Sequence, residues 1–479
     1  MKKPKLMLFC HVSNTKSITG SEKLLILFCR HISASFDCVL VAPQEGELTT
    51  YARQQQTEVR IQPYPLYFEM YTPHANLLND AEALRNAPNY DAILRLIAEV
   101  SPNVVLTNTC VNIVPAMAAK SLGIPVIWKL TEIITENAYT SLAVQWIDQY
   151  SDWVIAISQA VVQRFVGNIT SPISILYPSA GHNLGDTKTN QNLRFLKRKT
   201  LELGSNQSCI GYISSFIYKD KGLNHFIEMA LLLCVTHPNA RFLIIGSSIS
   251  TDKTYFDACV RNVKESGYTS RFTFIPYVKK VHPIYSAMDI LVVPSVVKEG
   301  FGLTALEGLL SAKPVVTFSS GGLVEMMQGT GNQDWLVEPG DSRGLATKVA
   351  FLLDHPEEAV AIGKHNQEMA NTRYGIDSFI AKLQEMVQHW CQLHPEWFTE
   401  PVVSPFHLKL QPNKKSIHAS KKKVHSRKKR AVRKKRVRKK NRYRSLKNRS
   451  LKRKMIRKKG KLLKKRYVTK HRKKLKKRR

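Results

Sequence analysis

The sequence predicts an α/β protein with two successive doubly wound parallel sheets and a basic C-terminal tail. Short apolar runs without polar alternation recur along the chain, and most are followed by a stretch with helical spacing. Such runs indicate strands that are buried on both faces by helices. The pattern occurs twice, on either side of a polar stretch, and 479 residues suffice for two domains and an extension.

The first array defines a domain over residues 1–180. Its expected strands are 6–12, 38–42, 103–107, 125–130, 153–157 and 173–177, and its clearest helices are 22–32, 113–122 and 136–150. The following residues are rich in Gly, Asn and Thr, which favours an interdomain linker over 181–207.

The second array defines a domain over residues 208–374. Its expected strands are 209–213, 241–245, 271–275, 290–293 and 314–317, with helices at 221–234 and throughout 344–392. We expect the last helix, within 375–400, to pack back toward the first domain. Ligands of doubly wound sheets bind at the carboxyl ends of the strands. Neither GxGxxG nor GxxxxGK[ST] follows a first strand, which argues against a nicotinamide, flavin or P-loop enzyme.

Positive charge is concentrated at the end of the chain. Residues 401–479 contain 39 of the 73 lysines and arginines and no acidic residue. The rest of the chain holds 34 basic and 36 acidic side chains and is therefore nearly neutral. Such a basic block repels itself and buries little apolar surface, so the tail is expected to be disordered. We expect it to bind an anionic membrane surface, a wall polymer or nucleic acid; a solvated extension without a partner is the alternative.

The cysteines and the apolar runs bear on location. The eight cysteines form no CxxC pair or Cys/His cluster, so neither a zinc site nor a disulfide framework is indicated. The run 6–12 is short and lacks a cleavage signal, which favours a first strand over a signal peptide. No run approaches the roughly 18–20 apolar residues that span a bilayer. We expect a cytoplasmic protein that can also attach peripherally to the inner membrane face or to an anionic surface layer.

The stretch PSVVKEGFGLTALEGLLSAKPVV, residues 294–316, carries the clearest chemistry. Gly300 and Gly302 lie between an apolar strand and a helix, where they let the backbone approach a ligand and present free N–H groups at the helix start. This arrangement suits a pyrophosphate. Glu299 and Glu307 are placed so that one carboxylate can approach a sugar and the other a ribose. Taken alone, the stretch also fits a tight turn with two solvated glutamates.

This stretch resembles the E-x7-E segment of the retaining GT-B glycosyltransferases of family 4, the glycosyl transferases group 1. Similar blocks are found at 19–25, 124–132, 152–160, 210–230, 240–246, 319–327 and 336–341. The resemblance implies two Rossmann-like domains that face a cleft. It also implies transfer of a hexosyl or N-acetylhexosaminyl group from a nucleoside-diphosphate sugar, expected to be UDP-linked, without a metal or other cofactor. The acceptor would be a hydroxyl of a glycan, lipid or cell-surface polymer.

The resemblance also implies roles for matched residues. Glu299 and Lys221 would be catalytic, with Glu299 near the transferred sugar and Lys221 opposite the leaving diphosphate, where negative charge develops. Glu307 would bind the ribose. Further donor-side residues would be Gly20, Ser215, Gly300, Phe301, Gly302 and Leu303.

Two departures from the family pattern bear on the identity of the donor. The family usually has an arginine about five residues before the lysine, whereas residues 215–217 here are Ser, Phe and Ile. Lys219 could substitute, although an ammonium is a point charge and not a bidentate fork. The family often has histidines where this chain has Lys129 and Thr131.

Weaker candidates lie on the acceptor side. Glu132 ends a strand that faces the predicted cleft, and His11 follows the first strand. A charge at a helix start and a core or loop histidine are the respective alternatives. Glu325 follows a glycine pair and is a further candidate to touch the sugar.

Two other functions fit the same sequence. A degenerate transferase could serve as a sugar-binding or scaffolding module that the tail tethers to an anionic surface or nucleic acid. The chain could also be a polyanion-binding structural protein. Turnover of nucleotide sugars distinguishes the transferase from both, and the sequence leaves the oligomeric state open.

Overall fold

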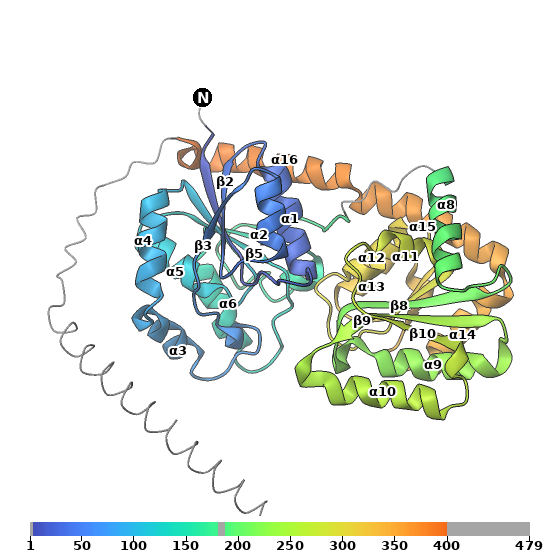
Figure 1. Cartoon of the computed structure of the whole chain (residues 1–479). Coiled ribbons are helices and arrows are strands. Elements are labelled where there is room, and N and C mark those ends of the chain that lie inside the picture. The colour runs from blue at the N-terminus through green and yellow to red at the C-terminus, as the bar shows by residue number, and fades with distance from the viewer. Residues whose placement is uncertain (1–2, 181–186, 400–479) are drawn as a thin grey trace, which may run out of the picture. The chain divides into compact units, whose positions relative to one another are not determined.

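The computed structural model describes residues 3–180 and 187–399 and contains two parallel sheets (Figure 1). The seven-stranded sheet has the order β3-β2-β1-β4-β5-β6-β7, and the six-stranded sheet has the order β10-β9-β8-β11-β12-β13. Strand order reverses between β1 and β4 in the first and between β8 and β11 in the second. The predicted fold class is confirmed. The basic tail, 401–479, lies outside the described residues.

The first domain surrounds the seven-stranded sheet. Its strands are β1 (Lys5–Phe9), β2 (Asp37–Ala42), β3 (Glu58–Ile61), β4 (Val104–Asn108), β5 (Val126–Leu130), β6 (Trp153–Ala156) and β7 (Ile173–Ile175). Its helices are α1 (Gly20–Ile32), α2 (Glu47–Gln54), α3 (Leu77–Ala83), α4 (Tyr90–Val100), α5 (Ile113–Ser121), α6 (Thr140–Gln149) and α7 (Gln159–Val162).

The second domain surrounds the six-stranded sheet. Its strands are β8 (Ser208–Ile217), β9 (Ala240–Ser248), β10 (Phe272–Ile275), β11 (Ile290–Val293), β12 (Val315–Phe318) and β13 (Leu336–Val337). Its helices are α8 (Thr187–Thr200), α9 (Leu223–Thr236), α10 (Lys253–Glu265), α11 (His282–Ala287), α12 (Leu303–Leu310), α13 (Gly322–Gly329), α14 (Ser342–Asp354) and α15 (Pro356–Tyr374).

Burial on both faces explains the continuous apolar strands. In β1, Met7 and Phe9 belong to one core cluster, and Leu6 and Leu8 belong to another on the opposite face of the sheet. All four side chains are fully buried. A strand between two helical layers therefore has no solvent face on which polar residues would alternate.

Several elements differ from the sequence expectation. β1 ends at Phe9, so residues 10–12 open a loop and do not extend the strand. The strand β3 was not predicted, because it lies at a sheet edge and its residues are only partly buried or exposed. The segment expected as a linker contains α8, which packs on α11. Arg194 and Arg198 of α8 both pair with Asp289, at 2.5 and 3.1 Å.

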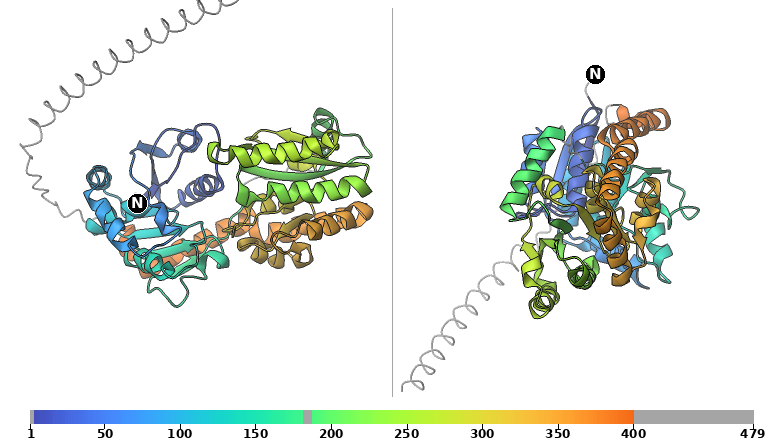
Figure 2. Two further views of the ribbon diagram at one scale, coloured as in Figure 1. Left: turned by 90° about the horizontal axis from the view of Figure 1, so that it is seen from below. Right: turned by 90° about the vertical axis from the view of Figure 1, so that its right-hand side faces the viewer.

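The last helix, α16 (Ile376–Leu393), packs on the first domain. Its residues Phe379, Leu383 and Trp390 join a core cluster that contains residues of β1, α1 and β2. Figure 2 shows these C-terminal helices, in orange, running from the second domain to the first. No helix within the described ranges is long and apolar enough to cross a membrane. All eight cysteines are free, and seven are buried.

Candidate active site

Glycines bring the loop after β11 close to its neighbours. A Cβ on Gly300 would lie 2.2 Å from the backbone oxygen of Thr131 in the first domain. Gly302 has a φ of 98°, and a Cβ there would lie 2.3 Å from the Leu323 side chain. Only glycine therefore permits both the close approach and the left-handed backbone that starts α12. The loop places the free N–H groups of α12 at the edge of the cleft.

A cleft of about 370 Å³ lies over the carboxyl ends of the strands. The second domain contributes most of its wall. The sequence-predicted residues that line the cleft are Gly20, Glu132, Ser215, Lys221, Glu299, Gly300, Phe301, Gly302 and Leu303. The structure therefore brings together most of the candidate residues. Glu307 and His11 do not line this cleft.

Lys221 and Glu299 form an ion pair in the cleft. The Lys221 Nζ lies 2.5 Å from Glu299 Oε1, which also accepts a hydrogen bond from Ser295 Oγ at 2.7 Å. Burial alone would lower the pKa of Lys221, but the neighbouring Glu299 carboxylate and Tyr218 phenol raise it above its ordinary value. Lys221 is therefore charged at neutral pH, and it lines the same cleft as the first residues of α12.

Gly222 fixes Lys221 against the loop. Its φ is 68°, and a Cβ there would lie 1.8 Å from the backbone oxygen of Pro294. Lys219, considered as a substitute for the family arginine, is exposed in the preceding 3-10 turn, η3 (Lys219–Lys221), and does not line the cleft.

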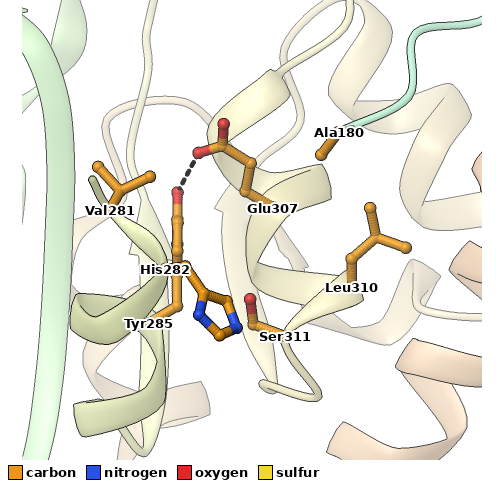
Figure 3. A pocket seen from close by; sticks show the side chains of 7 residues that line it. All are labelled: Ala180, Val281, His282, Tyr285, Glu307, Leu310 and Ser311. Atoms are coloured by element: carbon orange, nitrogen blue, oxygen red, sulfur yellow. Dashed lines mark hydrogen bonds between the residues drawn. The ribbon is translucent and has the colours of Figure 1, made fainter. Parts of the chain in front are cut away.

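Glu307 is engaged by two side chains. Its Oε1 lies 2.7 Å from the Nζ of Lys23 on α1, and its Oε2 accepts a hydrogen bond from the Tyr285 hydroxyl at 2.8 Å. Figure 3 shows the Tyr285 contact in a small pocket beside α12. The pocket volume of about 20 Å³ is closer to that of a water than of a nucleoside. A ligand that uses Glu307 must therefore share or replace the contact with Lys23.

The acceptor-side candidates lie at the carboxyl ends of first-domain strands, with His11 after β1 and Glu132 after β5. Glu132 lines the cleft and accepts hydrogen bonds from Thr131 Oγ1 at 2.6 Å and from the Cys110 backbone N–H at 3.2 Å. Burial raises its pKa. His11 is half-buried, and its Nδ1 has no hydrogen-bond partner among the described residues.

Glu325 ties the two domains together. Its carboxylate accepts hydrogen bonds from the backbone N–H groups of Gln159 and Ala160 at 2.9 and 3.3 Å, and from the Tyr177 hydroxyl at 2.5 Å. Ser158 Oγ donates to the Gly300 backbone oxygen at 2.6 Å. Glu325 therefore caps the start of α7 in this arrangement and does not point into the cleft.

Sequence reasoning missed the partners of the predicted residues. Lys23 and Tyr285 contact Glu307, Ser295 contacts Glu299, and Tyr218 lies beside Lys221. Lys23 lies in the block 19–25, which resembles the family. This resemblance was the feature of the sequence that could have identified Lys23 as a site residue. Within 3–180 and 187–399, no three His, Cys, Asp or Glu residues are grouped as a metal site.

Residues 207–355 match the family model of the glycosyl transferases group 1. Two relatives are the capsular polysaccharide biosynthesis glycosyltransferase CapM of Staphylococcus aureus and the 2-deoxystreptamine glucosyltransferase of Streptomyces kanamyceticus. CapM is 23% identical over 241 residues, which cover 49% of this chain and 60% of CapM. The second is 27% identical over 169 residues, which cover 35% of this chain and 42% of that relative. The chain thus spans less than two thirds of either relative.

Among solved structures, Anabaena Alr3699/HepE in complex with UDP and glucose is similar over almost its whole length. The match covers 80% of this chain and 99% of that chain, with a TM-score of 0.67 and 19% sequence identity. The family model thus matches most of the second domain, and the two sheets together have the GT-B fold of these structures.

Proposed function

We propose that this protein transfers a sugar, with retention of configuration, from a nucleoside-diphosphate sugar to a hydroxyl acceptor. The ion pair of Lys221 and Glu299 beside the N-terminus of α12 carries the proposal. HepE is described in complex with UDP and glucose, which supports UDP as the nucleotide. CapM is named for capsular polysaccharide biosynthesis, which supports an envelope glycan as the acceptor.

The chain's own groups can stabilise a leaving diphosphate. The α12 N–H groups and the Lys221 ammonium face the same part of the cleft, and both favour an anion. As the bond from the sugar to the diphosphate breaks, negative charge grows on the phosphate oxygens. The α12 N–H groups and the Lys221 ammonium stabilise this charge without a metal. Ser295 and Lys221 hold Glu299 where the transferred sugar would lie.

The ribose hydroxyls are assigned to Glu307. A carboxylate with both oxygens directed at donors suits a pair of vicinal hydroxyls. Lys23 holds one of these oxygens. Nucleotide entry therefore involves exchange of this contact, and binding affinity includes the free energy of breaking it.

Hydrolysis of a panel of nucleotide sugars by the full chain tests the reaction. We expect slow release of sugar from one or a few donors. Because Glu299 is assigned to the transition state, Glu299→Gln should lower kcat and leave the donor KM nearly unchanged. The exposed Glu338→Gln is the control. Absence of turnover for every donor, or full turnover with weakened donor binding in Glu299→Gln, would contradict the proposal.

We assign polyanion binding to residues 401–479, which supports peripheral attachment of a cytoplasmic enzyme. The 39 basic residues of this segment are unbalanced by any acid. A chain that ends at residue 400 should keep nucleotide-sugar hydrolysis and lose retention on vesicles rich in phosphatidylserine. Each phosphate neutralised on duplex DNA should add a salt slope of roughly −0.9 in the full chain. Loss of hydrolysis in a folded, shortened chain would instead assign the tail to the active site.

A further inference from the structure

The carboxyl end of β5, one strand from the reversal point of the first sheet, contains a buried lysine without a direct counter-ion. Lys129 on β5 is 3% exposed, and its Nζ donates one hydrogen bond, to Asn108 Oδ1 at 3.2 Å. No carboxylate within the described ranges lies within ion-pair distance of Lys129. A buried ammonium without compensation is costly, so a charge of opposite sign is required nearby. Glu132, three residues further along, is the acid that acts on it.

The local backbone is built to hold Glu132. Thr109, which follows β4, has a φ of 82°, a conformation that β-branched residues rarely adopt. Its N–H donates to the Lys129 backbone oxygen at 2.8 Å, and its own oxygen accepts from Trp128 Nε1 at 2.9 Å. This turn directs the next N–H, that of Cys110, onto the Glu132 carboxylate. Strained backbone of this kind is concentrated at functional sites.

Glu132 faces the donor groups across the cleft. It lines the same cavity as Lys221 and Glu299, and the preceding residue, Thr131, presents its backbone oxygen to Gly300. Burial, and then its titratable neighbours, which include the Glu132 and Glu299 carboxylates, raise the pKa of the Tyr71 phenol. The second domain already supplies groups for the diphosphate, the sugar and the ribose. A carboxylate on the opposite wall is therefore placed to accept a hydrogen bond from a hydroxyl that approaches the sugar.

We propose that Glu132, which lines the cleft and is held by hydrogen bonds from Thr131 and Cys110, binds the attacking hydroxyl of the acceptor, and that the buried Lys129 is a positioning residue for it. This inference rests on the proposed transferase function and deepens it. The titratable groups that face Glu132 are Lys129 on β5, Cys110 after β4, and Tyr71; His11, from the loop after β1, faces Lys129. Lys129 is the one cation among them, since the His11 ring is neutral near pH 7. Burial raises the pKa of Glu132, hydrogen bonds from Thr131 and Cys110 lower it, and the charge of Lys129 lowers it further, so loss of Lys129 should raise this pKa.

The first measurement uses water, the simplest hydroxyl acceptor, and a donor that the wild type hydrolyses. Glu132→Gln should lower the hydrolytic kcat at least tenfold. It should change the donor KM and the calorimetric Kd of UDP less than twofold. If Glu132→Gln hydrolyses the donor at the wild-type rate, or weakens UDP binding to the same extent as it slows turnover, the acceptor role is wrong.

The second measurement tests the coupling of the two residues. In Lys129→Met the acidic limb of the hydrolysis profile should move to higher pH, with activity restored at higher pH, because the charge of Lys129 lowers the pKa of Glu132. The Glu132 carboxyl, assigned by comparison with Glu132→Gln, should show the same shift in 13C NMR. Asn108→Asp, which gives Lys129 a direct partner, should shift the limb in the same direction. Lys120→Met on α5 is the control, because Lys120 pairs with Asp152.

The possible outcomes distinguish failure of the role of Lys129, failure of the acceptor role of Glu132 and failure of the proposed function. An unchanged carboxyl titration in both Lys129→Met and Asn108→Asp would overturn the role of Lys129, whether or not the protein turns over a donor. Normal UDP binding and hydrolysis in the wild type, combined with normal hydrolysis in Glu132→Gln, would overturn the acceptor role alone. A wild type that neither binds UDP nor hydrolyses any donor would overturn both the proposed function and this inference.

Discussion

The two sheets of this protein reverse strand order in the same way, but the charges near the carboxyl ends of their strands are arranged differently. At the carboxyl edge of the second sheet, where its strands end, Lys221 and Glu299 are in direct contact at 2.5 Å. At the carboxyl edge of the first sheet, Lys129 and Glu132 are neighbours without a direct ion pair. Both edges line or adjoin one cleft. The paired charges suit a site that receives an anion, and the unpaired charges suit a site that receives a neutral hydroxyl.

Under the proposed function, this difference lets a shared topology serve two kinds of chemistry. An incoming diphosphate carries its own negative charge, so the second domain needs a cation held ready by a partner that can yield. An incoming hydroxyl carries no charge. The first domain therefore needs an ionised carboxylate that accepts its hydrogen bond, and the buried groups around that carboxylate set its pKa. Substitutions at the two edges should therefore differ in their effects on turnover, nucleotide affinity and stability.

The largest effect is expected for Lys221→Met. Loss of the cation opposite the leaving diphosphate should lower kcat by about 10²–10³-fold, the range measured for removal of one preorganised transition-state donor. Steady-state hydrolysis of the preferred nucleotide sugar measures it. Lys219→Met is the control, because Lys219 is exposed two residues away. Equal losses in the two variants would show that general positive charge matters and that the specific contact does not.

A smaller effect is expected for Glu307→Ala. This variant removes hydrogen bonds to a charged group and should weaken binding of the nucleoside diphosphate by about 1.5–3 kcal/mol. Titration calorimetry measures the change, with the exposed Glu265→Ala as the control. Unchanged affinity would remove Glu307 from the nucleotide site.

The second-domain edge could be predicted from sequence because its chemistry depends on local backbone. Gly300 and Gly302 directly mark a loop that no other residue could form, and the glutamates follow at fixed spacing within the same segment. The strands were predictable for a related reason, since burial on both faces leaves continuous apolar runs. The weakly buried β3 and the helix α8, with a polar sequence, carry no such signal.

The first-domain edge could not be predicted in the same way because its chemistry depends on distant contacts. Lys129 gave no sign of burial, since a lysine in sequence is equally a surface charge. The contact of Lys23 with Glu307 joins residues 284 positions apart. Cys110 contributes its backbone N–H, and the residue type at a position does not indicate which group its backbone N–H contacts. His11 and Glu132 were named, but their surroundings were not.

The pH dependence of stability should reveal the unpaired charge of the first edge. Burial, and then the charge of Lys129, lower the pKa of His11 to about 4, from an ordinary value near 6.5. Between these values the unfolded chain binds a proton that the folded protein excludes, so stability rises with pH. The contribution is present in full above pH 6.5 and is lost as the pH falls toward 4.

The half-buried ring limits this loss to on the order of 1–2 kcal/mol. His11→Asn should reduce the fall in the urea midpoint between pH 7 and pH 4.5, and the exposed His355→Asn should behave as the wild type. An identical fall in His11→Asn would show that the histidine is protonated without cost and that the first edge tolerates a second cation.

The smallest effect is expected for Lys23→Met, and its sign is the informative result. Lys23 pairs with Glu307 Oε1, and its side chain is 33% exposed. A partly exposed ion pair contributes about 0.5–1 kcal/mol, so removal of this competitor should tighten UDP binding by roughly 2–5-fold. Added salt should raise the affinity of the wild type toward that of the variant, because salt screens the pair that the ribose must replace. Lys16→Met, in the exposed loop before α1, should leave the affinity unchanged. Weaker binding in Lys23→Met would mean that Lys23 moves onto the nucleotide, so that the first domain also supplies a cation to the donor. In that case the division between a paired donor edge and an unpaired acceptor edge would fail.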